Sequence, residues 1–474
     1  MGRNAFVALM LVSCAFLAAC GGGSMNTPPT VNGVPMSLTI RDTPPSGVAV
    51  LFFEALITGG NLQPSDMTKS PVAVITTPVE VEFGHLQTDT AFLSLSNIPP
   101  DTYKSLTLTF GNAVLTIVNH SGAAIGSCAN NAVCQITPNF NPSTATLTSP
   151  FPIAVTADET FGIKLDFNVN DSLQSDLSVN PMVSVVKVTQ RRREDDQDDM
   201  EEAEDVDGQV TGLGTSQFTL MNERSGQSFT VNVDSNTVFE DFDKAGCTAS
   251  PQNFSCVKMG QIVEVDLDES GMGAMLAKRV KLEEEANEEA LKATITTVDS
   301  STLFHAVVFN EEPTVSGVSE GAQVAVTILP TTMFEVSSEE MGEDGGFTQT
   351  GLMFGSAADL LMGQDVQIHP QMVTSAGGVT TITADRIRLR PSQITGQVGT
   401  INSDGTFMLT PSSSLFTGAT PAITSIKVEV VPEMEFEDVS GISGLAVGNT
   451  VSVKGLLFNT SGTPTLLAKA IRKQ

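Results

Sequence analysis

The sequence contains no tryptophan and a single tyrosine, although it contains 25 phenylalanines. Phe serves mainly in packing, whereas Tyr and Trp add the polar group that is favoured at binding surfaces. This shortage argues against a sugar-stacking platform and against a groove that binds single-stranded nucleic acid by stacking. Positive charge is also scarce, with 24 Lys and Arg against 54 Asp and Glu. An excess of acid this large opposes nucleic-acid binding and adhesion to anionic lipid, because both depend on basic side chains.

No apolar run near the N-terminus is long enough to cross a bilayer, which takes about 20 residues. The apolar stretch Ala5–Phe16 follows Arg3 and leads to small residues, a pattern typical of an export signal. The string Leu17-Ala18-Ala19-Cys20 then resembles the lipobox of bacterial lipoproteins. That resemblance implies a signal peptide over residues 1–19, a diacylglycerol on the Cys20 sulfur and a further acyl chain, such as palmitate, on its amino group. The alternative is an ordinary signal peptide with an incidental cysteine.

Residues 20–33 are glycine-rich at their start and predict a flexible tether. Removal of Arg3 with the signal leaves 23 basic and 54 acidic residues, a formal charge of −31. Two acyl chains suffice for stable anchoring. Gly21, rather than an aspartate, follows the cysteine, which resembles lipoproteins sent to the outer membrane. We therefore expect a protein of the cell envelope, lipid-anchored at the outer membrane on its periplasmic or surface face.

Four cysteines remain after Cys14 leaves with the signal and Cys20 is acylated, and they form two close pairs. These are Cys128 with Cys134 and Cys247 with Cys256. Export to an oxidising compartment favours disulfides, and the two local bridges are the expected pairing among three connectivities. The spacing does not fit a tetrahedral metal site.

Residues 34–188 alternate apolar and polar residues in some eight or nine short segments cut by Pro, Gly and Asn. This pattern predicts an antiparallel β-sandwich. The segment "IPPDTYKSLTLTF" resembles a strand-turn-strand of transthyretin-like and immunoglobulin-like sandwiches, in which the tyrosine docks at a corner. With "LTIRDTPPSGV" and "KLDFNVNDSL", it also resembles an uncharacterised N-terminal domain family of bacterial lipoproteins.

An acidic run without an apolar face interrupts the pattern, and residues 189–206 are expected to form a solvated linker. The aspartates of the acidic run, which extends from Asp195 to Asp207, are the weak candidates for loose Ca²⁺ binding, since hard cations take oxygen ligands, although the full spaced loop of an EF-hand is absent. They are Asp195, Asp196, Asp198, Asp199, Asp205 and Asp207. No other metal or cofactor is expected.

The sequence then repeats one strand pattern three times, over residues 207–283, 290–390 and 393–474. Each copy has an apolar strand ending in Phe-Glu, a loop of variable length, a strand led by glycine and a closing Ala-x-x-Ile/Val strand. The framework residues are Phe239, Glu240 and Gly260; Phe334, Glu335 and Gly363; and Phe436, Glu437 and Gly448. The glutamates could form a shared ion or contact site, or alternation could simply direct them to solvent.

Five short strands per copy, closed by a glycine-led strand, predict a small β-barrel. "SAADLLMG", residues 356–363, offers a short N-capped helix before the fourth strand, where OB-folds place theirs. The copies resemble an uncharacterised small-barrel family of bacterial secreted and lipid-anchored proteins, and more distantly the periplasmic OB-fold family. The joints are expected at residues 283–292 and around Pro391-Ser392.

No motif in the sequence lies in the structural context that its catalytic chemistry requires. "GVSEG", residues 317–321, matches the nucleophile elbow, but that motif works on a strand-to-helix turn and here it lies between strands. The four histidines, at positions 85, 120, 305 and 369, share no short motif and are expected to be packed or surface residues. A carboxylate-pair glycosidase would need a substrate cleft.

We therefore expect a non-catalytic, lipid-anchored binding or structural module without cofactors. It would contact the membrane through its anchor and an unidentified envelope protein or small ligand, and would bind no nucleic acid. The alternatives are a periplasmic carrier of a ligand or divalent cation and, less favoured, an envelope hydrolase.

Overall fold

The computed structural model describes residues 33–43, 49–157, 161–190, 202–221, 228–243, 245–268, 275–284, 289–311, 315–336, 352–460 and 463–474. The expected signal peptide, Cys20, residues 20–32 of the tether and Asp195, Asp196, Asp198 and Asp199 lie outside these ranges. The described residues from Gly33 onward belong to one compact unit. Within the described ranges, no helix has the length and apolar character needed to cross a bilayer.

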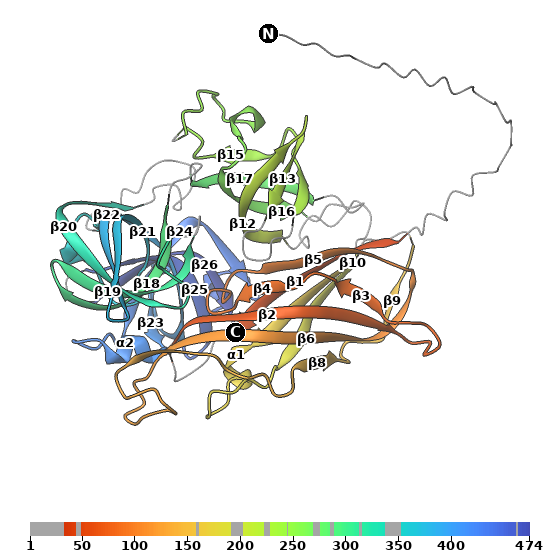
Figure 1. Ribbon diagram of the computed structural model, residues 1–474, viewed down its shortest axis with the longest axis horizontal. Helices are drawn as coiled ribbons and strands as arrows, with labels where there is room; N and C mark the ends of the chain where they lie inside the picture. The colour runs from red at the N-terminus through yellow and green to blue at the C-terminus, as the bar shows by residue number, and fades with distance from the viewer. Residues whose placement is uncertain are drawn as a thin grey trace, which may run out of the picture. The chain divides into compact units, whose positions relative to one another are not determined.

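Residues 33–190 form two packed sheets, shown from red to yellow in Figure 1. One sheet has the order β11-β10-β1-β5; in the other, β3-β2-β6-β7 is joined by β4 on β2 and by β8 and β9 on β6. The strands are β1 (Val34–Thr43), β2 (Ala49–Pro64), β3 (Val72–Ile75), β4 (Val79–Glu82), β5 (Ala91–Ile98), β6 (Asp101–Val118), β7 (Val133–Ile136), β8 (Thr144–Leu147), β9 (Ile153–Val155), β10 (Phe161–Asn168) and β11 (Val183–Gln190), with helix α1 at Val169–Ser172. Alternating apolar residues from both sheets meet in one core, as expected for a sandwich.

The sandwich is not antiparallel throughout, which corrects one part of the sequence prediction. Strand β1 pairs with β5 antiparallel but with β10 parallel, in a register that runs from Met36 opposite Phe161 to Thr43 opposite Asn168. Alternation of apolar residues has the same period in both kinds of ladder. The pattern therefore shows that β1 is a strand but does not show the direction of its neighbour.

Tyr103 is docked at a corner, as its sequence context suggested. Its ring is buried, and its hydroxyl donates to the carbonyl oxygen of Pro99, four residues earlier, at 2.7 Å. Burial raises the pKa of the Tyr103 hydroxyl to about 12, so the donor proton is retained over the physiological range.

Tyr103→Phe is expected to lower the free energy of unfolding of the sandwich by about 1–2 kcal/mol, because the Pro99 carbonyl loses its donor while the ring stays in place. Circular dichroism during urea unfolding measures this, since the substitution removes the single tyrosine fluorophore. A variant as stable as the parent would show that the corner hydrogen bond contributes nothing.

Three small barrels follow, shown from green to blue in Figure 1. Barrel 1 consists of β12 (Glu202–Leu213), β13 (Gln217–Met221), β14 (Ser228–Asn232), β15 (Val238–Glu240), β16 (Ile262–Asp268) and β17 (Met275–Glu284). Barrel 2 consists of β18 (Leu291–Ser300), β19 (Leu303–Glu311), β20 (Gln323–Val336), β21 (Asp365–Ala376) and the first half of β22 (Val379–Ile401). Barrel 3 consists of the second half of β22, β23 (Phe407–Pro411), β24 (Ile426–Glu437), β25 (Thr450–Phe458) and β26 (Thr465–Lys473), with helix α2 at Ser414–Gly418.

Each barrel closes in the strand order of an OB-fold. The third strand pairs in parallel with the fifth, through β14 and β15 on β17, β20 on β22, and β24 on β26. A single 3₁₀ turn precedes the fourth strand in each: η1 (Phe254–Cys256), η3 (Ala357–Asp359) and η4 (Ile442–Gly444). The predicted helix at 356–363 is therefore one turn only, begun by a Ser356 and Asp359 capping box. The fold is all-β with OB-like barrels.

Barrels 2 and 3 share a strand, which corrects the joint expected at Pro391-Ser392. Strand β22 pairs with β21 over residues 379–390 and with β25 over residues 391–397, without a break. Proline cannot donate to a ladder. A strand that passes from one barrel to the next loses only that one donor.

The expected acidic linker is shorter than residues 189–206. Strand β11 extends to Gln190, and β12 begins at Glu202, opposite Asp268 of β16. Backbone pairing with β16 holds these residues in the ladder, and Val206 reaches the barrel core. Asp205 and Asp207 therefore belong to a strand rather than to a solvated linker.

Candidate functional site

The three framework glycines occupy one conformation that other residues rarely adopt. Gly260, Gly363 and Gly448 have φ of 88°, 85° and 89°. Their amides donate to the carbonyls of Val210, Ile295 and Val398, one on each barrel's first strand, at 2.8, 2.9 and 2.8 Å. The positive φ, which glycine alone adopts at no steric cost, turns the chain into the fourth strand.

The residue after each glycine carries a second repeated contact that the sequence analysis missed. Gln261, Gln364 and Asn449 each accept, on the side-chain amide oxygen, a hydrogen bond from the backbone N–H three residues earlier, at 2.5–2.9 Å. The signal was present as Gly-Gln, Gly-Gln and Gly-Asn in the three copies. These amides are structural turn caps.

The framework glutamates face basic residues on the closing strand. Backbone pairing sets Glu240 opposite Lys281, Glu335 opposite Arg388 and Glu437 opposite Arg472. The Glu335 carboxylate lies 3.5 Å from the Arg388 guanidinium, and that of Glu240 lies 3.6 Å from Arg279. These ion pairs fit a contact site better than they fit the alternative, in which strand alternation simply directs the glutamates to solvent. The three phenylalanines beside them pack on their barrel cores.

In barrel 3, the framework glutamate Glu437 contacts the sandwich. The Glu437 carboxylate pairs with Arg41 of β1 and, at 2.8 Å, with Lys164 of β10. Burial alone would raise the pKa of Glu437, but Lys164 and Arg41 outweigh it and lower that pKa. Arg472, only 2% exposed, donates to the carbonyl of Gln87 at 2.8 Å.

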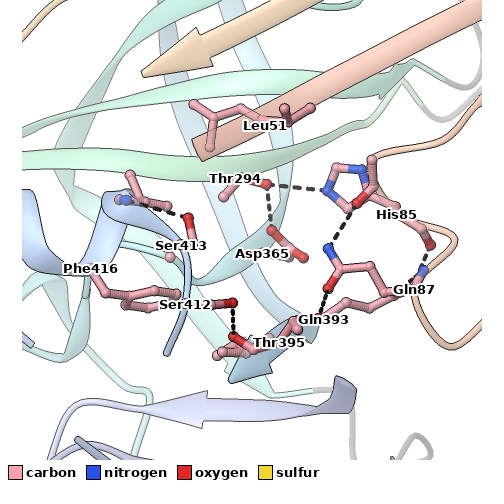
Figure 2. A pocket seen from close by; sticks show the side chains of 15 residues that line it. Leu51, His85, Gln87, Thr294, Asp365, Gln393, Thr395, Ser412, Ser413 and Phe416 are labelled. Atoms are coloured by element: carbon pink, nitrogen blue, oxygen red, sulfur yellow. Dashed lines mark hydrogen bonds between the residues drawn. The ribbon is translucent and has the colours of Figure 1, made fainter. Parts of the chain in front are cut away.

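A pocket of about 70 Å³, with a lining of mixed polar and apolar residues, lies where the sandwich, barrel 2 and barrel 3 meet (Figure 2). At roughly 10–15 Å³ per water, it has room for a few water molecules rather than for a large substrate. Polar side chains line much of it: His85 and Gln87 from the sandwich, Thr294 and Asp365 from barrel 2, and Gln393, Thr395, Ser412 and Ser413 from barrel 3. We take this pocket as the candidate functional site.

Gln393 joins barrel 3 to the sandwich loop that follows β4. Its amide oxygen accepts from the backbone N–H of Gln87 at 2.8 Å and of Thr88 at 3.1 Å. Its amide nitrogen donates to the His85 carbonyl and to the Asp89 carboxylate, both at 2.6 Å. All four hydrogen-bonding positions of the amide are thereby used.

A chain of side-chain contacts crosses from the sandwich into barrel 2 (Figure 2). The Nδ1 atom of His85 lies 2.7 Å from the Glu82 carboxylate, and Nε2 lies 3.4 Å from the Thr294 hydroxyl. Thr294 in turn donates to the Asp365 carboxylate at 2.6 Å. The His85 ring also stacks on Phe309 of β19, with ring centroids 3.8 Å apart. The interface is thus both polar and packed.

Asp365 is the buried carboxyl of the pocket. It is 4% exposed, and burial raises its pKa to about 6, although His85 and the Thr294 hydrogen bond act in the opposite direction. Its backbone N–H donates to the Ser392 hydroxyl at 2.8 Å. A carboxyl that titrates near neutrality can report pH, but its partners decide whether it does chemistry.

Glu82, His85 and Thr294 have the order of an acid, a base and a hydroxyl nucleophile. A nucleophile of this kind must give its proton to the imidazole. Here the Thr294 proton goes to Asp365 instead. The nearby N–H groups of Gly84 and Gly363 already donate to Glu82 and to Ile295. An oxyanion would therefore find neither of these donors free, which disfavours acyl transfer at this pocket.

The remaining histidines contact different partners. His120 contacts Asn131, His305 pairs with Asp299 at 2.7 Å, and His369 contacts Arg386. Among the described residues, no group of three His, Cys, Asp or Glu side chains could hold a metal ion. Both expected disulfides, Cys128–Cys134 and Cys247–Cys256, are formed.

The segment that matched a nucleophile elbow is a docking turn. Residues 317–321 connect β19 to β20, with no helix after them. The Gly321 carbonyl accepts from the buried Thr116 hydroxyl of β6 at 2.6 Å, and the Glu320 carbonyl accepts from Gln135 at 3.0 Å. The Glu320-Gly321 end of this turn therefore brings barrel 2 against the sandwich.

Two segments of the chain match the model of a family described as a domain of unknown function (DUF5666). They are residues 207–281, in barrel 1, and residues 395–472, in barrel 3. No curated protein matches the chain. Among solved structures, a chain titled "drosophila Unr CSD456" aligns with 57% of this chain and 97% of its own length, at 11% identity and a TM-score of 0.12. A similarity this low supports no statement about function.

Proposed function

We propose that this protein is a non-catalytic bacterial lipoprotein that presents a rigid β-domain scaffold at the cell envelope, as a binding or structural module. One observation carries the scaffold role. The polar groups of the pocket bond to each other across the boundaries between the sandwich and the two barrels, through Gln393 and the chain from Glu82 to Asp365. Hydrogen bonds of this kind resist relative movement of the domains. A site whose polar groups are already bonded to each other is less suited to admit a substrate.

The proposal extends to the middle barrel, which we assign to the same domain family as barrels 1 and 3. Support comes from its strand order and from the Phe334-Glu335 and Gly363-Gln364 pairs. Their contacts match those of the other two copies. Three tandem copies on one anchor would offer three similar surfaces to an envelope partner.

Attachment to the membrane is proposed from Leu17-Ala18-Ala19-Cys20. Expression in a two-membraned bacterium with labelled palmitate is expected to label the parent chain, and globomycin is expected to block its processing. Cys20→Ser should lose the label, because the acceptor sulfur is gone. Cys14→Ser, a matched change within the expected signal, should keep it. Palmitate incorporation that persists in Cys20→Ser, or is missing from the parent, would overturn the anchor.

A further inference from the structure

Strand β7 lies at one end of its sheet, where it pairs with β6. Its side chains alternate between the two faces of the sheet. Cys134 and Ile136, on one face, pack on the sandwich core. On the other face, Val133 packs on an apolar cluster that contains Val307 of barrel 2 and Leu415 of barrel 3. This short strand therefore joins the sandwich core to both barrels.

Polar side chains of β6 and β7 hold one turn of barrel 2. Thr116 and Gln135 lie opposite each other in the two strands. The Thr116 hydroxyl donates to the Gly321 carbonyl at 2.6 Å. The Gln135 amide donates to the adjacent carbonyl, that of Glu320, at 3.0 Å. Because Gln135 and Val133 are two residues apart, both depend on the position of one face of β7.

The loop between β6 and β7 reaches helix α2 of barrel 3. The His120 ring lies against Gly418, where an added Cβ atom would overlap it. Nδ1 of His120 lies 3.0 Å from the side-chain oxygen of Asn131. The preceding residue, Asn119, donates through its side-chain amide to the Cys128 carbonyl at 2.9 Å. Contacts within the loop around Cys128 therefore position the ring that meets barrel 3.

The Cys128–Cys134 disulfide ties this loop to β7. Cys128 is fully buried in the sandwich core, and Cys134 lies between Val133 and Gln135 in the chain. The bond joins residues six positions apart, and a crosslink removes conformations that an open loop would sample. It therefore fixes one face of β7 to the core and leaves Val133 and Gln135 directed at the barrels.

We propose that the Cys128–Cys134 disulfide is an oxidation-dependent clasp, which fastens β7 to the sandwich and thereby holds barrels 2 and 3 against it. The inference rests on the scaffold role proposed above and adds a condition under which that scaffold becomes rigid. In the reduced chain, β7 is a strand of four residues at the end of a sheet. Local opening of such an element is frequent, and it withdraws Val133 and Gln135 from the barrels together.

Closure of the clasp is a two-electron oxidation. The thiols of Cys128 and Cys134 lose two protons and two electrons as their sulfur atoms join, and an oxidant that carries a disulfide takes these up and becomes a dithiol. A dithiol reductant reverses the step by attack on Cys134, because Cys128 is fully buried. The domains therefore dock firmly in an oxidising compartment and less firmly in a reducing one.

Hydrogen–deuterium exchange of the purified full chain, with and without dithiothreitol, tests the clasp. The chain carries Cys247→Ser and Cys256→Ser, so that of the two disulfides only Cys128–Cys134 is left to reduce. Segments 317–321 and 414–418 report the docked parts of barrels 2 and 3, and segment 161–168 of β10 reports the sandwich core. Reduction is expected to speed exchange in both docked segments by about 10- to 100-fold, and by more than in the core.

The oxidised form of the same variant is the control, and it should match the parent in both docked segments because the removed disulfide lies within barrel 1. Gln135→Ala then distinguishes an effect through β7 from a general loss of stability. In the oxidised chain it should speed exchange of segment 317–321 about fivefold, since one hydrogen bond is lost. In the reduced chain it should add little, because β7 has already opened.

Docked segments that keep their protection after reduction would overturn the clasp and leave the scaffold role intact. The clasp would also be overturned if the core loses as much protection as the docked segments, or if Gln135→Ala has the same effect in both redox states. Docked segments of the oxidised parent that exchange as fast as an unstructured peptide would overturn the rigid scaffold itself, and the clasp with it.

Discussion

Gln393→Glu is expected to release barrel 3 from the sandwich loop and to lower the free energy of unfolding of the sandwich by about 3–5 kcal/mol at pH 7. The two donors of the parent amide, bonded to the His85 carbonyl and to the Asp89 carboxylate at 2.6 Å, would be replaced by an acceptor. The new carboxylate at position 393 would face the carboxylate of Asp89. Lys454, paired with Asp89, offsets part of this repulsion.

Urea unfolding followed by tyrosine fluorescence measures the effect, because Tyr103 is the single tyrosine, tryptophan is absent, and the signal therefore reports the sandwich. Lowering the pH to about 5 should restore part of the loss, since a protonated carboxyl regains one donor. Gln397→Glu places the same change four residues along β22, at an exposed position. It should leave the transition unchanged. Equal transitions for the two variants would show that the Gln393 amide does not join the domains.

Gly321→Ala is expected to separate barrel 2 from the sandwich at a cost of about 2–5 kcal/mol. Gly321 has φ of 74°, where a side chain is strained. A Cβ atom there would lie 2.6 Å from the Gln135 amide nitrogen and 2.7 Å from the Phe52 ring. Phe52 is fully buried in an apolar cluster that joins β2 to Val307 of barrel 2 and Leu415 of α2, so it has little room to move.

Gly317→Ala is the matched control within the same turn. Gly317 has φ of 87°, but a Cβ atom there would lie 3.8 Å from Val373, an ordinary contact. Both variants carry the backbone strain, and only Gly321→Ala adds the clash. Proteolysis and urea unfolding should show a larger loss for Gly321→Ala. If Gly317→Ala is equally destabilised, the strain of the turn, rather than the close approach to Phe52, is what matters.

The periodicity of the sequence predicted the local elements well. Alternation of apolar and polar residues predicted the strands of the sandwich and the barrels. The segment around Tyr103 predicted the corner at which its ring docks. Close spacing, together with the expectation of export, predicted the Cys128–Cys134 and Cys247–Cys256 bridges, and both are formed. The glycine-led strands indicated barrel closure, and the left-handed φ of Gly260, Gly363 and Gly448 fits that expectation. These features depend on residues near one another in the chain or on the two-residue repeat of a strand.

The sequence patterns did not predict the candidate site. His85, Thr294, Asp365 and Gln393 come from four separate segments, and none belongs to a motif. His85 had the expected character of a packed histidine, and Thr294 and Asp365 resembled any alternating strand residue. A weak signal existed for the turn caps, in the repeated Gly-Gln and Gly-Asn pairs.

The sequence by itself determined that this chain is a series of Phe-cored β-modules, acidic and crosslinked by two local disulfides. Burial of alternating apolar side chains follows from a strand's period alone. Only the tertiary structure decided that β1 pairs in parallel with β10, that β22 serves two barrels, and that a histidine, a threonine and an aspartate meet at one junction. Those outcomes depend on which surfaces pack together, and contacts between residues far apart in the chain leave no periodic trace in a single sequence.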